Sequence, residues 1–258
     1  DLVRLMRDRE LLWLLALSEI KAKHRQTALG LLWAVIQPVG MAAMFTLVFS
    51  VFVQIPVNGV PYPIFAYTGL VCWLFLSNSL SLGLPSVVGH ANLVTKANFP
   101  REVIPLAKVV TALVDLMVGG VVLLVALLIV RGSLPLAVFV LPLIFLVHLA
   151  FSVGLVLWGS ALYVRRRDIG SILPLGLQLW MFATPIVYPL SVVPDRFQPW
   201  ILMLNPLAGI IETYRQVLLW GALPSPTLFL PAIFSALGVL VSGYWYFKSV
   251  EPQFADLV

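Results

Sequence analysis

Charge is the scarcest property of this sequence. Only 10% of its 258 residues are Asp, Glu, Lys or Arg, and 61% are hydrophobic, whereas about 25% of the residues of a soluble globular domain are charged. Residues 26–95 contain none of these four residue types. Because roughly 20 apolar residues cross a bilayer, the composition excludes a soluble protein and predicts a polytopic membrane protein.

Cysteine is nearly absent as well. Cys72 is the only one, and it lies in an apolar run, which excludes a disulfide framework or a cysteine-based metal site. No group of His, Cys, Asp and Glu has metal-ligand spacing, no lysine follows a glycine as in a phosphate-binding loop, and no G-x-S-x-G nucleophile elbow occurs. The sequence therefore predicts a chain without a metal, nucleotide or catalytic site of its own, and hence not an enzyme.

Glycine, proline and polar residues divide the sequence into six apolar runs. The divisions include Asn58-Gly59, a dipeptide typical of tight turns. The predicted spans are residues 28–53, 64–88, 109–130, 134–164, 169–188 and 227–247. We expect an all-α fold, because a helix satisfies its own backbone hydrogen bonds at membrane depth.

The basic residues are distributed unevenly over this arrangement. Thirteen of the 16 Lys and Arg fall on the side that six spans assign to both termini, and only Arg131, Arg196 and Arg215 fall outside it. Positive residues are enriched in cytoplasmic loops, so we expect both termini to be cytoplasmic. The same pattern explains the isoelectric point near 9.6 without a nucleic-acid partner.

Residues 1–27 predict an amphipathic helix that lies in the membrane interface. Its charged residues, among them Glu19 and Lys23, are expected at the polar positions. The alternative is a plain juxtamembrane tail. The apolar face would consist of Leu2, Leu5, Met6, Trp13, Leu17 and Ile20.

Residues 195–220 are apolar but are interrupted by Asn205-Pro206. The two parts, 196–204 and 206–220, are each too short to cross a bilayer. We predict two re-entrant half-helices on the side opposite the termini, where irregular backbone must be buried in protein or line a wet cavity.

Two ionisable residues lie inside predicted spans, and such residues are functional candidates. Asp115 lies 16 residues before Arg131, and His148 lies 16 residues after Gly132. An antiparallel hairpin would place both at similar depth, so we expect them to pair. The pair would be either a structural polar contact between helices or part of a proton relay.

Aromatic residues provide candidates for a substrate pathway. Phe45, Phe49 and Phe52 have the i, i+4, i+7 spacing of one helix face, and Trp180 and Tyr188 lie on the fifth predicted span. Aromatic rings can stack on sugar faces, although such stripes also serve as packing or as interfacial belts. Trp33, at the start of the first span, is assigned to the same pathway.

Several short motifs follow one another in a definite order along the six spans. In that order they resemble the membrane subunit of type 2 ABC exporters, specifically the polysaccharide or O-antigen permeases called Wzm and their teichoic-acid relatives. Glu19 and His24 depart from the Asp and Tyr that are common in that family. The motifs are Lys21-Ala22-Lys23-His24-Arg25-Gln26-Thr27 with Trp33 and Pro38, Asn92 with Lys96 and Phe99-Pro100-Arg101-Glu102, Arg167-Asp168-Ile169, Thr184-Pro185, Tyr188-Pro189, Asn205-Pro206 with Arg215, and Phe254-Ala255-Asp256.

The resemblance implies a working unit of two permeases and two separate ATPase chains, with ATP and Mg²⁺ in the ATPase and no cofactor in this chain. It implies a coupling segment at residues 89–108, for which a solvated loop is the alternative, and a gate at residues 195–220. The cargo would be a lipid-linked glycan, O-antigen or similar, exported across a bacterial inner membrane. The implied coupling residues are Asn92, Lys96, Phe99, Arg101, Glu102, Arg167 and Asp168, and the implied gate residues are Asn205, Pro206 and Arg215.

Three other functions remain open from the sequence alone. An ABC exporter of drugs or other lipids would have the same architecture. A proton-coupled secondary carrier would use Asp115 and His148 and would work without an ATPase. A membrane-embedded glycosyltransferase would need a carboxylate cluster near the interface, which Glu102 and Asp168 alone do not provide.

Overall fold

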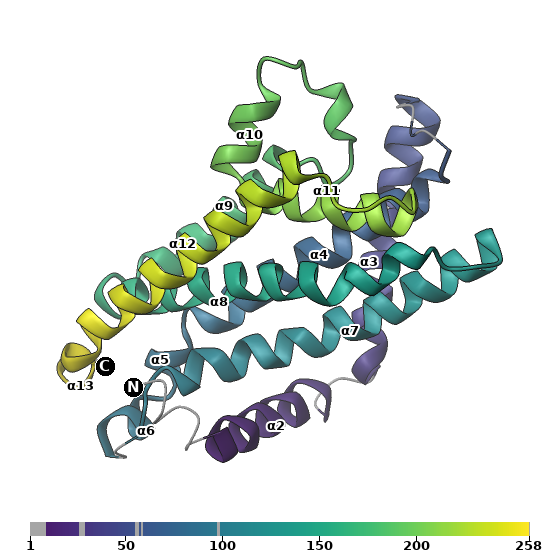
Figure 1. Ribbon diagram of the computed structural model, residues 1–258. Coiled ribbons are helices and arrows are strands. Elements are labelled where there is room, and N and C mark those ends of the chain that lie inside the picture. The colour runs from purple at the N-terminus through teal and green to yellow at the C-terminus, as the bar shows by residue number, and fades with distance from the viewer. Residues whose placement is uncertain (1–8, 26–28, 55–56, 58, 97–98, 258) are drawn as a thin grey trace.

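The computed structural model describes residues 9–25, 29–54, 57, 59–96 and 99–257. Every regular element in this part of the chain is a helix (Figure 1), which confirms the all-α prediction. The elements are α2 (Arg9–Arg25), η1 (Gly30–Leu32), α3 (Trp33–Phe45), η2 (Thr46–Phe52), α4 (Tyr62–Gly83), α5 (Ser86–Gly89), α6 (Ala91–Lys96), α7 (Val103–Arg131), η3 (Leu136–Val140), α8 (Leu141–Arg165), α9 (Ile169–Ala183), η4 (Leu190–Val192), α10 (Gln198–Leu204), α11 (Pro206–Leu219), α12 (Pro226–Val250), η5 (Glu251–Gln253) and α13 (Phe254–Leu257).

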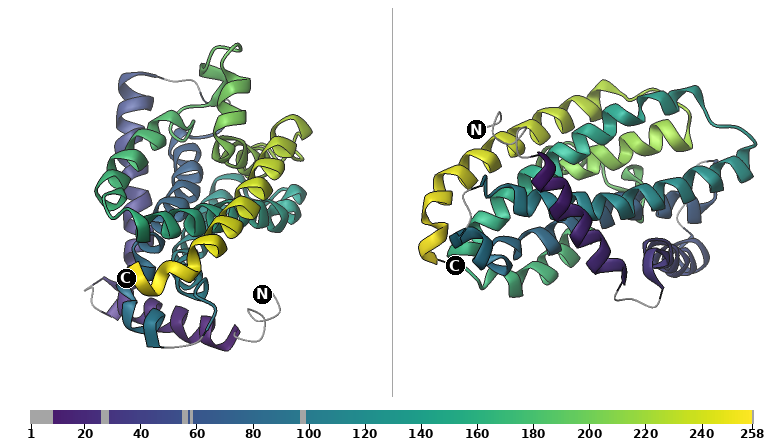
Figure 2. Two further views of the ribbon diagram at one scale, coloured as in Figure 1. Left: turned by 90° about the vertical axis from the view of Figure 1, so that its left-hand side faces the viewer. Right: turned by 90° about the horizontal axis from the view of Figure 1, so that it is seen from below.

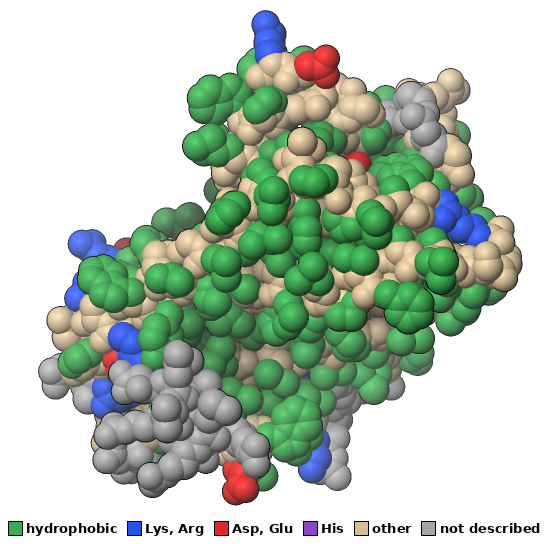
Figure 3. All heavy atoms as spheres, in the orientation of Figure 1, with side chains coloured by type: hydrophobic (Ala, Val, Ile, Leu, Met, Phe, Trp, Pro, Cys, Tyr) green, Lys and Arg blue, Asp and Glu red, His purple; other side chains and the backbone are tan. Residues whose placement is uncertain are grey.

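Five helical segments of the described chain are long and apolar enough to cross a membrane, so the protein is a multi-pass membrane protein. They are Gly30–Phe52, Tyr62–Gly83, Val103–Arg131, Leu136–Arg165 and Pro226–Gln253. Figure 3 shows hydrophobic side chains over the middle of one face and Lys and Arg toward its edges. Such a surface is that of a protein solvated by lipid rather than by water.

The predicted fifth span, 169–188, is shorter in the structure than the sequence suggested. Helix α9 has 15 residues and ends at Ala183, so it is about 22 Å long at 1.5 Å per residue, less than the ~30 Å hydrocarbon core. Thr184 is extended, with φ −96° and ψ 137°, because a residue before proline is driven out of the helical region. The chain therefore leaves the helix before the predicted end of the span.

Helix α4 lies at the centre of the bundle. It packs against α3, α7, α8 and α11, and 83% of its apolar window is buried, whereas only 11% is buried in Gly30–Phe52. The chain after α9 approaches α4 so closely at Gly69 that only glycine fits, because a Cβ there would lie 2.7 Å from the carbonyl oxygen of Ile186. The first membrane helix is thus a peripheral element and the second is the core.

The predicted loop at 89–108 is mostly helical. It contains α6 and the beginning of α7, which starts at Val103 rather than at residue 109. The apolar side chains of Val103, Ile104 and Ala107 are buried, so packing extends α7 beyond the lipid-spanning part. Helices α5 and α6 form the corner between α4 and α7, and α13 contacts α6.

Helices α10 and α11 match the predicted half-helices closely. They are joined at Asn205, which has φ −128° and ψ 82°, and they lie at one end of the bundle, beyond the C-terminal end of α9 (Figures 1 and 2). Helix α11 is buried over most of its length, while no residue of α10 is. We name this the far end, and the end that carries Arg101, Arg165 and Lys248 the basic end.

Candidate functional site

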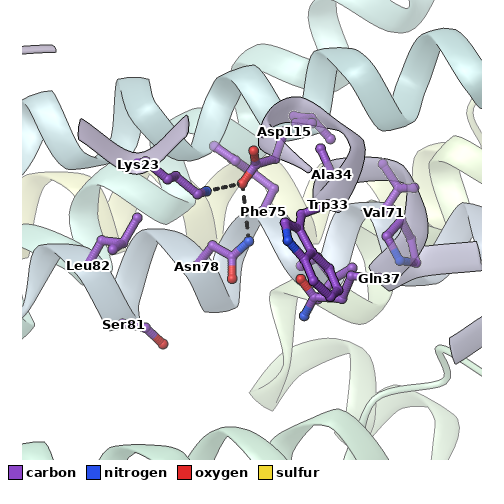
Figure 4. A pocket seen from close by; sticks show the side chains of 14 residues that line it. Lys23, Trp33, Ala34, Gln37, Val71, Phe75, Asn78, Ser81, Leu82 and Asp115 are labelled. Carbon is purple, nitrogen blue, oxygen red and sulfur yellow. Dashed lines mark hydrogen bonds and ion pairs between the residues drawn. The ribbon is translucent and has the colours of Figure 1, made fainter. Parts of the chain in front are cut away.

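A pocket of about 270 Å³ opens among α2, α3, α4 and α7 (Figure 4). Its walls are apolar except for a few polar side chains that converge on it. The aromatic side chain at its edge, Trp33, is 49% exposed. The polar and aromatic lining residues are Lys23, Trp33, Gln37, Asn78, Ser81 and Asp115.

An ion pair closes one side of this pocket. The ammonium of Lys23 on α2 donates to Oδ2 of Asp115 on α7, and the same oxygen accepts from Nδ2 of Asn78 at 3.4 Å. The side chains of Lys23 and Asp115 are 33% and 13% exposed. The carboxylate inside α7 is thus neutralised by the helix that precedes the first span.

The predicted pair of Asp115 and His148 is wrong. His148 is fully buried, with its ring edge-on to Phe75 at 4.9 Å between centroids and near Tyr214 at 6.0 Å. Neither of its ring nitrogens has a hydrogen-bond partner among the described residues. Counting residues from the turn predicts that both side chains lie at a similar depth, but it does not determine which face of each helix they occupy. Helices α7 and α8 both pack on α4, so their polar residues need not face each other.

The interface helix α2 is oriented differently from the prediction. Two of its charged residues, Glu19 and Lys23, face the protein: Oε2 of Glu19 lies 2.6 Å from Nζ of Lys108, and Oε1 lies 3.3 Å from Nε2 of His90. Ala16 is buried, whereas Trp13 is 56% exposed. The apolar residues at 2, 5 and 6 in the predicted face lie outside the described residues. Helix α2 therefore docks on α7 through charges and presents part of its apolar surface outward.

The predicted substrate residues do not form one continuous stripe. Phe45 and Phe49 contact each other, with centroids 6.0 Å apart, and are partly buried against the core, but Phe52 is 71% exposed. The cause is the π-helix from Thr46 to Phe52, in which the N–H of Val53 binds the carbonyl of Val48 at 3.0 Å. Its wider turn rotates Phe52 away from the face that α-helical spacing predicts.

The aromatic residues of the fifth predicted span lie toward the far end. Nε1 of Trp180 donates to Oδ1 of Asn205 at 3.1 Å, and its ring is edge-on to Trp73 at 5.9 Å. The hydroxyl of Tyr188 donates to the carbonyl of Phe182 at 3.0 Å. A cleft of about 510 Å³ between α9 and α10 is lined by Trp180, Phe197, Trp200 and Asn205. These side chains are separate from Trp33, which lines the pocket at α2 and α3.

Arg215, a predicted gate residue, holds the far end together. Its side chain is fully buried. Nη1 donates to the carbonyl of Pro185 at 2.7 Å, Nη2 donates to the carbonyl of Ile186, and the guanidinium lies over the ring of Phe65 at 3.6 Å from the centroid. Glu212 lies 3.4 Å from Nη1. The residue thus satisfies main-chain oxygens that the end of α9 leaves free.

The other two gate residues form the joint between the half-helices. Asn205 is buried, and its Nδ2 donates to Oγ1 of Thr184 at 2.7 Å. Pro206 begins α11 at a position where proline is favoured. Together with Arg215 they fix α11 against the chain that follows α9.

The basic end is held by a network of charged side chains. Nζ of Lys248 lies 2.7 Å from Oε2 of Glu102 and 2.9 Å from Oε2 of Glu251. Nη1 of Arg101 donates to the carbonyl oxygen of Glu251 at 2.6 Å, and the N–H of Arg101 donates to its Oε1 at 3.2 Å. The predicted coupling residues Arg101 and Glu102 therefore bind the C-terminal segment of their own chain.

The remaining predicted coupling residues differ in exposure. Phe99 packs partly buried against an apolar cluster that contains the buried Phe254 of α13. Asn92 and Asp168 are exposed, and Arg167 is exposed while its Nη2 donates to the carbonyl of Leu257 at 3.4 Å. The side chain of Lys96 lies outside the described part of the structure. The exposed surface here is formed by α6 and by the turn before α9.

Sequence reasoning missed the polar side chains that line the pocket together with Trp33. A charge inside a span requires a partner, and Lys23 is one of the last cations before the uncharged run, so it was a candidate that the spacing argument did not consider. Gln37, Asn78 and Ser81 gave no comparable signal, because polar residues in a span face other helices as often as a cavity.

Comparison with known proteins finds membrane transport proteins that match most or all of this chain. The profile of the family described as "ABC-2 type transporter" matches residues 10–219. The O-antigen export system permease protein RfbA of Myxococcus xanthus is 31% identical over all of both chains, and a protein of the same name from Klebsiella pneumoniae is 28% identical over 96% of this chain and 95% of its own. The polysialic acid transport protein KpsM of Escherichia coli is 23% identical over 80% of each chain. The chain therefore belongs to the ABC-2 type transporter family.

Proposed function

We propose that the protein is the permease half of an ATP-driven exporter that moves a lipid-linked polysaccharide from the cytoplasmic side across a bacterial inner membrane. The names of its relatives support the cargo. The described residues contain no group of three His, Cys, Asp or Glu that could hold a metal. ATP and Mg²⁺ belong to a separate ATPase chain.

One observation carries the transport function: polar side chains are exposed on α3 and α9, which the protomer leaves largely uncovered, and at the C-terminal end of the otherwise buried α4. Gln37 on α3, Ser81 on α4 and Gln178 on α9 are exposed, and Leu177 is the one buried residue of α9. Polar groups at membrane depth must be covered by protein or line a wet cavity. A translocation route between α3 and α9, with the polar part of α4 as its floor, satisfies this requirement.

A second copy of the chain would complete the route. Helices α3 and α9 present large apolar side chains outward, among them Ile36, Met44, Leu175 and Leu179. Two copies that meet along these helices would enclose a channel between the polar faces. A symmetric pair of this kind is the commonest form of homo-oligomer.

The basic ends of the two copies are the docking surfaces for two ATPase chains. Asn92, Leu93 and Thr95 are exposed on α6, and Arg166 and Asp168 are exposed in the turn before α9. This orientation places both termini in the cytoplasm. Arg101 and Glu102 act from behind the surface, because they bind the C-terminal segment instead of facing outward.

The far end contains the gate. The fifth crossing consists of the short α9 and the chain up to η4, and α10 and α11 re-enter as the half-helices that cover the outer mouth. Arg215 anchors α11, while α10 has no buried residue, so α10 is the part that moves.

The topology is tested by labelling Ser191→Cys from outside intact cells with an impermeant maleimide. Thr95→Cys should react only after permeabilisation, and the reverse order would contradict it.

The alternative function, a proton-coupled carrier, required a pair of Asp115 and His148, and these two residues do not pair.

The function is tested by deleting the gene in its own host and measuring glycan at the cell surface and inside the cell. We expect surface glycan to vanish, internal lipid-linked glycan to accumulate, and the purified pair of permease and ATPase to hydrolyse ATP in lipid. Unchanged surface glycan would favour an exporter of drugs or other lipids.

A further inference from the structure

We infer that the pocket among α2, α3, α4 and α7 binds a single uncharged sugar ring, and that the cargo is a neutral glycan instead of a polyanion. This inference rests on the proposed function and adds the class of substrate. It is carried by the size of the pocket, the free hydrogen-bonding groups in its wall, and the distribution of charge along the route.

The pocket has the size of one ring. Its volume of about 270 Å³ is just below the ~300–1,000 Å³ of pockets that enclose drug-sized ligands. A sugar ring fits such a space, whereas a stretch of polymer does not. The pocket would therefore hold one residue of a longer glycan, with the rest of the glycan on the open side.

The polar wall has unused hydrogen-bonding capacity. Among the described residues, the structure gives no hydrogen-bond partner to the amide of Gln37, the carbonyl oxygen of Asn78 or the hydroxyl of Ser81. These groups offer donors and acceptors together, which is what ring hydroxyls require. Unpaired polar groups in an apolar pocket cost free energy until a ligand or water binds them.

An aromatic face completes the binding surface. The indole of Trp33 is half-exposed and lines the pocket beside Gln37, as Figure 4 shows. The face of an aromatic ring carries negative potential, so it attracts the weakly positive C–H groups of a sugar ring. Polar groups on one side and an aromatic face on the other match the two kinds of surface that a pyranose presents.

Charge decides between a neutral and an anionic glycan. The pocket contains one cation and one anion, Lys23 and Asp115, and they neutralise each other. No Lys, Arg, Asp or Glu occurs in α3, η2, α4 or α9, the helices that flank the proposed route. Arg215 is fully buried and bound to carbonyls. The proposed route therefore presents no fixed cation that could attract a polyanion.

The experiment uses thiol protection in the complex of permease and ATPase reconstituted in lipid. Cys72→Ala removes the native thiol, Ser81→Cys reports on the pocket, and Ser191→Cys in η4 is the matched control away from it. The probes are the methyl glycosides of mannose, glucose, galactose and N-acetylglucosamine, with α2,8-linked trisialic acid as the anionic probe. The readout is the rate of maleimide labelling.

At least one neutral glycoside should slow labelling of Ser81→Cys, about twofold at a concentration equal to its Kd, and leave Ser191→Cys unaffected. Trisialic acid should have no effect. In an Asp115→Asn background Lys23 is no longer neutralised, so trisialic acid should then slow the labelling. The inference is overturned if no neutral glycoside protects Ser81→Cys, or if trisialic acid protects it while Asp115 is intact.

The two experiments distinguish a wrong assignment of the pocket from a wrong assignment of the function. If deletion of the gene abolishes surface glycan but no glycoside protects Ser81→Cys, export stands and the pocket assignment falls. If deletion leaves surface glycan unchanged, the proposed function falls whatever the pocket binds.

Discussion

At the basic end, the ammonium of Lys248 binds the carboxylates of Glu102 and Glu251, and the side chains of Lys248 and Glu251 are 20% and 19% exposed, although Glu102 is buried. At the far end, one fully buried guanidinium binds main-chain oxygens of Pro185 and Ile186. Water can replace a lost partner of Lys248 or Glu251, but not one of Arg215. Exposed ion pairs therefore contribute little each, while removal of a buried charged partner is costly.

The largest effect should follow from Arg215→Met. The carbonyls of Pro185 and Ile186 would be left unpaired in a site without water, so we expect a loss of about 3–5 kcal/mol and failure to accumulate folded protein. The matched control is Arg131→Met, because Arg131 also donates to a carbonyl, that of Leu218 at 3.2 Å, but is exposed. The yield of folded protein and, where enough accumulates, thermal unfolding in detergent measure both, and equal losses would remove the distinction between a buried and an exposed arginine.

A double-mutant cycle on Lys23 and Asp115 examines the intermediate case, a pair that is partly exposed but reaches a membrane-spanning helix. Lys23→Met leaves a carboxylate inside α7, where an unpaired charge costs about 2.5–3.5 kcal/mol. Adding Asp115→Asn should recover much of that loss. Thermal unfolding of the single and double variants gives the coupling, and strictly additive losses would show that the pair contributes nothing.

Gly69→Ala examines the close contact that Arg215 requires. A Cβ would lie 2.8 Å from Nη2 of Arg215 and 2.7 Å from the carbonyl of Ile186, and such overpacking costs about 1–3 kcal/mol. Gly40→Ala on α3 is the control, since nothing lies within 4 Å of a Cβ there. A Gly69→Ala protein as stable as Gly40→Ala would mean that the contact is loose.

The smallest effect on stability should come from Glu251→Gln, which weakens the contacts with Lys248 while Arg101 keeps its bond to the carbonyl. We expect a loss of about 1 kcal/mol or less. If the C-terminal segment positions the docking surface, ATP hydrolysis by the complex should fall by more than this loss explains. Gln253→Ala, which removes one exposed hydrogen bond from Arg165, is the control, and equal ATPase rates in the two variants would contradict a positioning role.

The sequence predicted well what depends on local composition. The absence of charge over residues 26–95 indicated lipid-spanning helices, and Asn205-Pro206 marked the joint between α10 and α11, because proline cannot continue a preceding helix. The π-helix at Thr46–Phe52 has no such marker in the sequence, so Phe52 was assigned to the wrong face of the helix. The end of α4 at Gly83, the start of α7 at Val103 and the end of α9 at Ala183 are determined by tertiary packing or by a following proline.

The candidate site was only partly predictable. Trp33 and Arg215 were identified, but the contacts between charged residues join positions that lie far apart in sequence: Asp115 is 92 residues from Lys23, and Glu251 is 150 residues from Arg101. Such pairs depend on helix phase and docking, which a residue count between two turns does not give. The same limit caused the wrong pairing of Asp115 with His148.

The ion pair of Lys23 and Asp115 also constrains the order in which the protein can be assembled. Helix α2 is synthesised before its charged partners Lys108 and Asp115, which lie on α7 and leave the ribosome only after two further membrane helices. Until α2 docks, α7 must enter the membrane with an uncompensated carboxylate. Helix α2 thus reaches its final place only after later helices have been made, and a delay in its docking would expose α7 to membrane quality control.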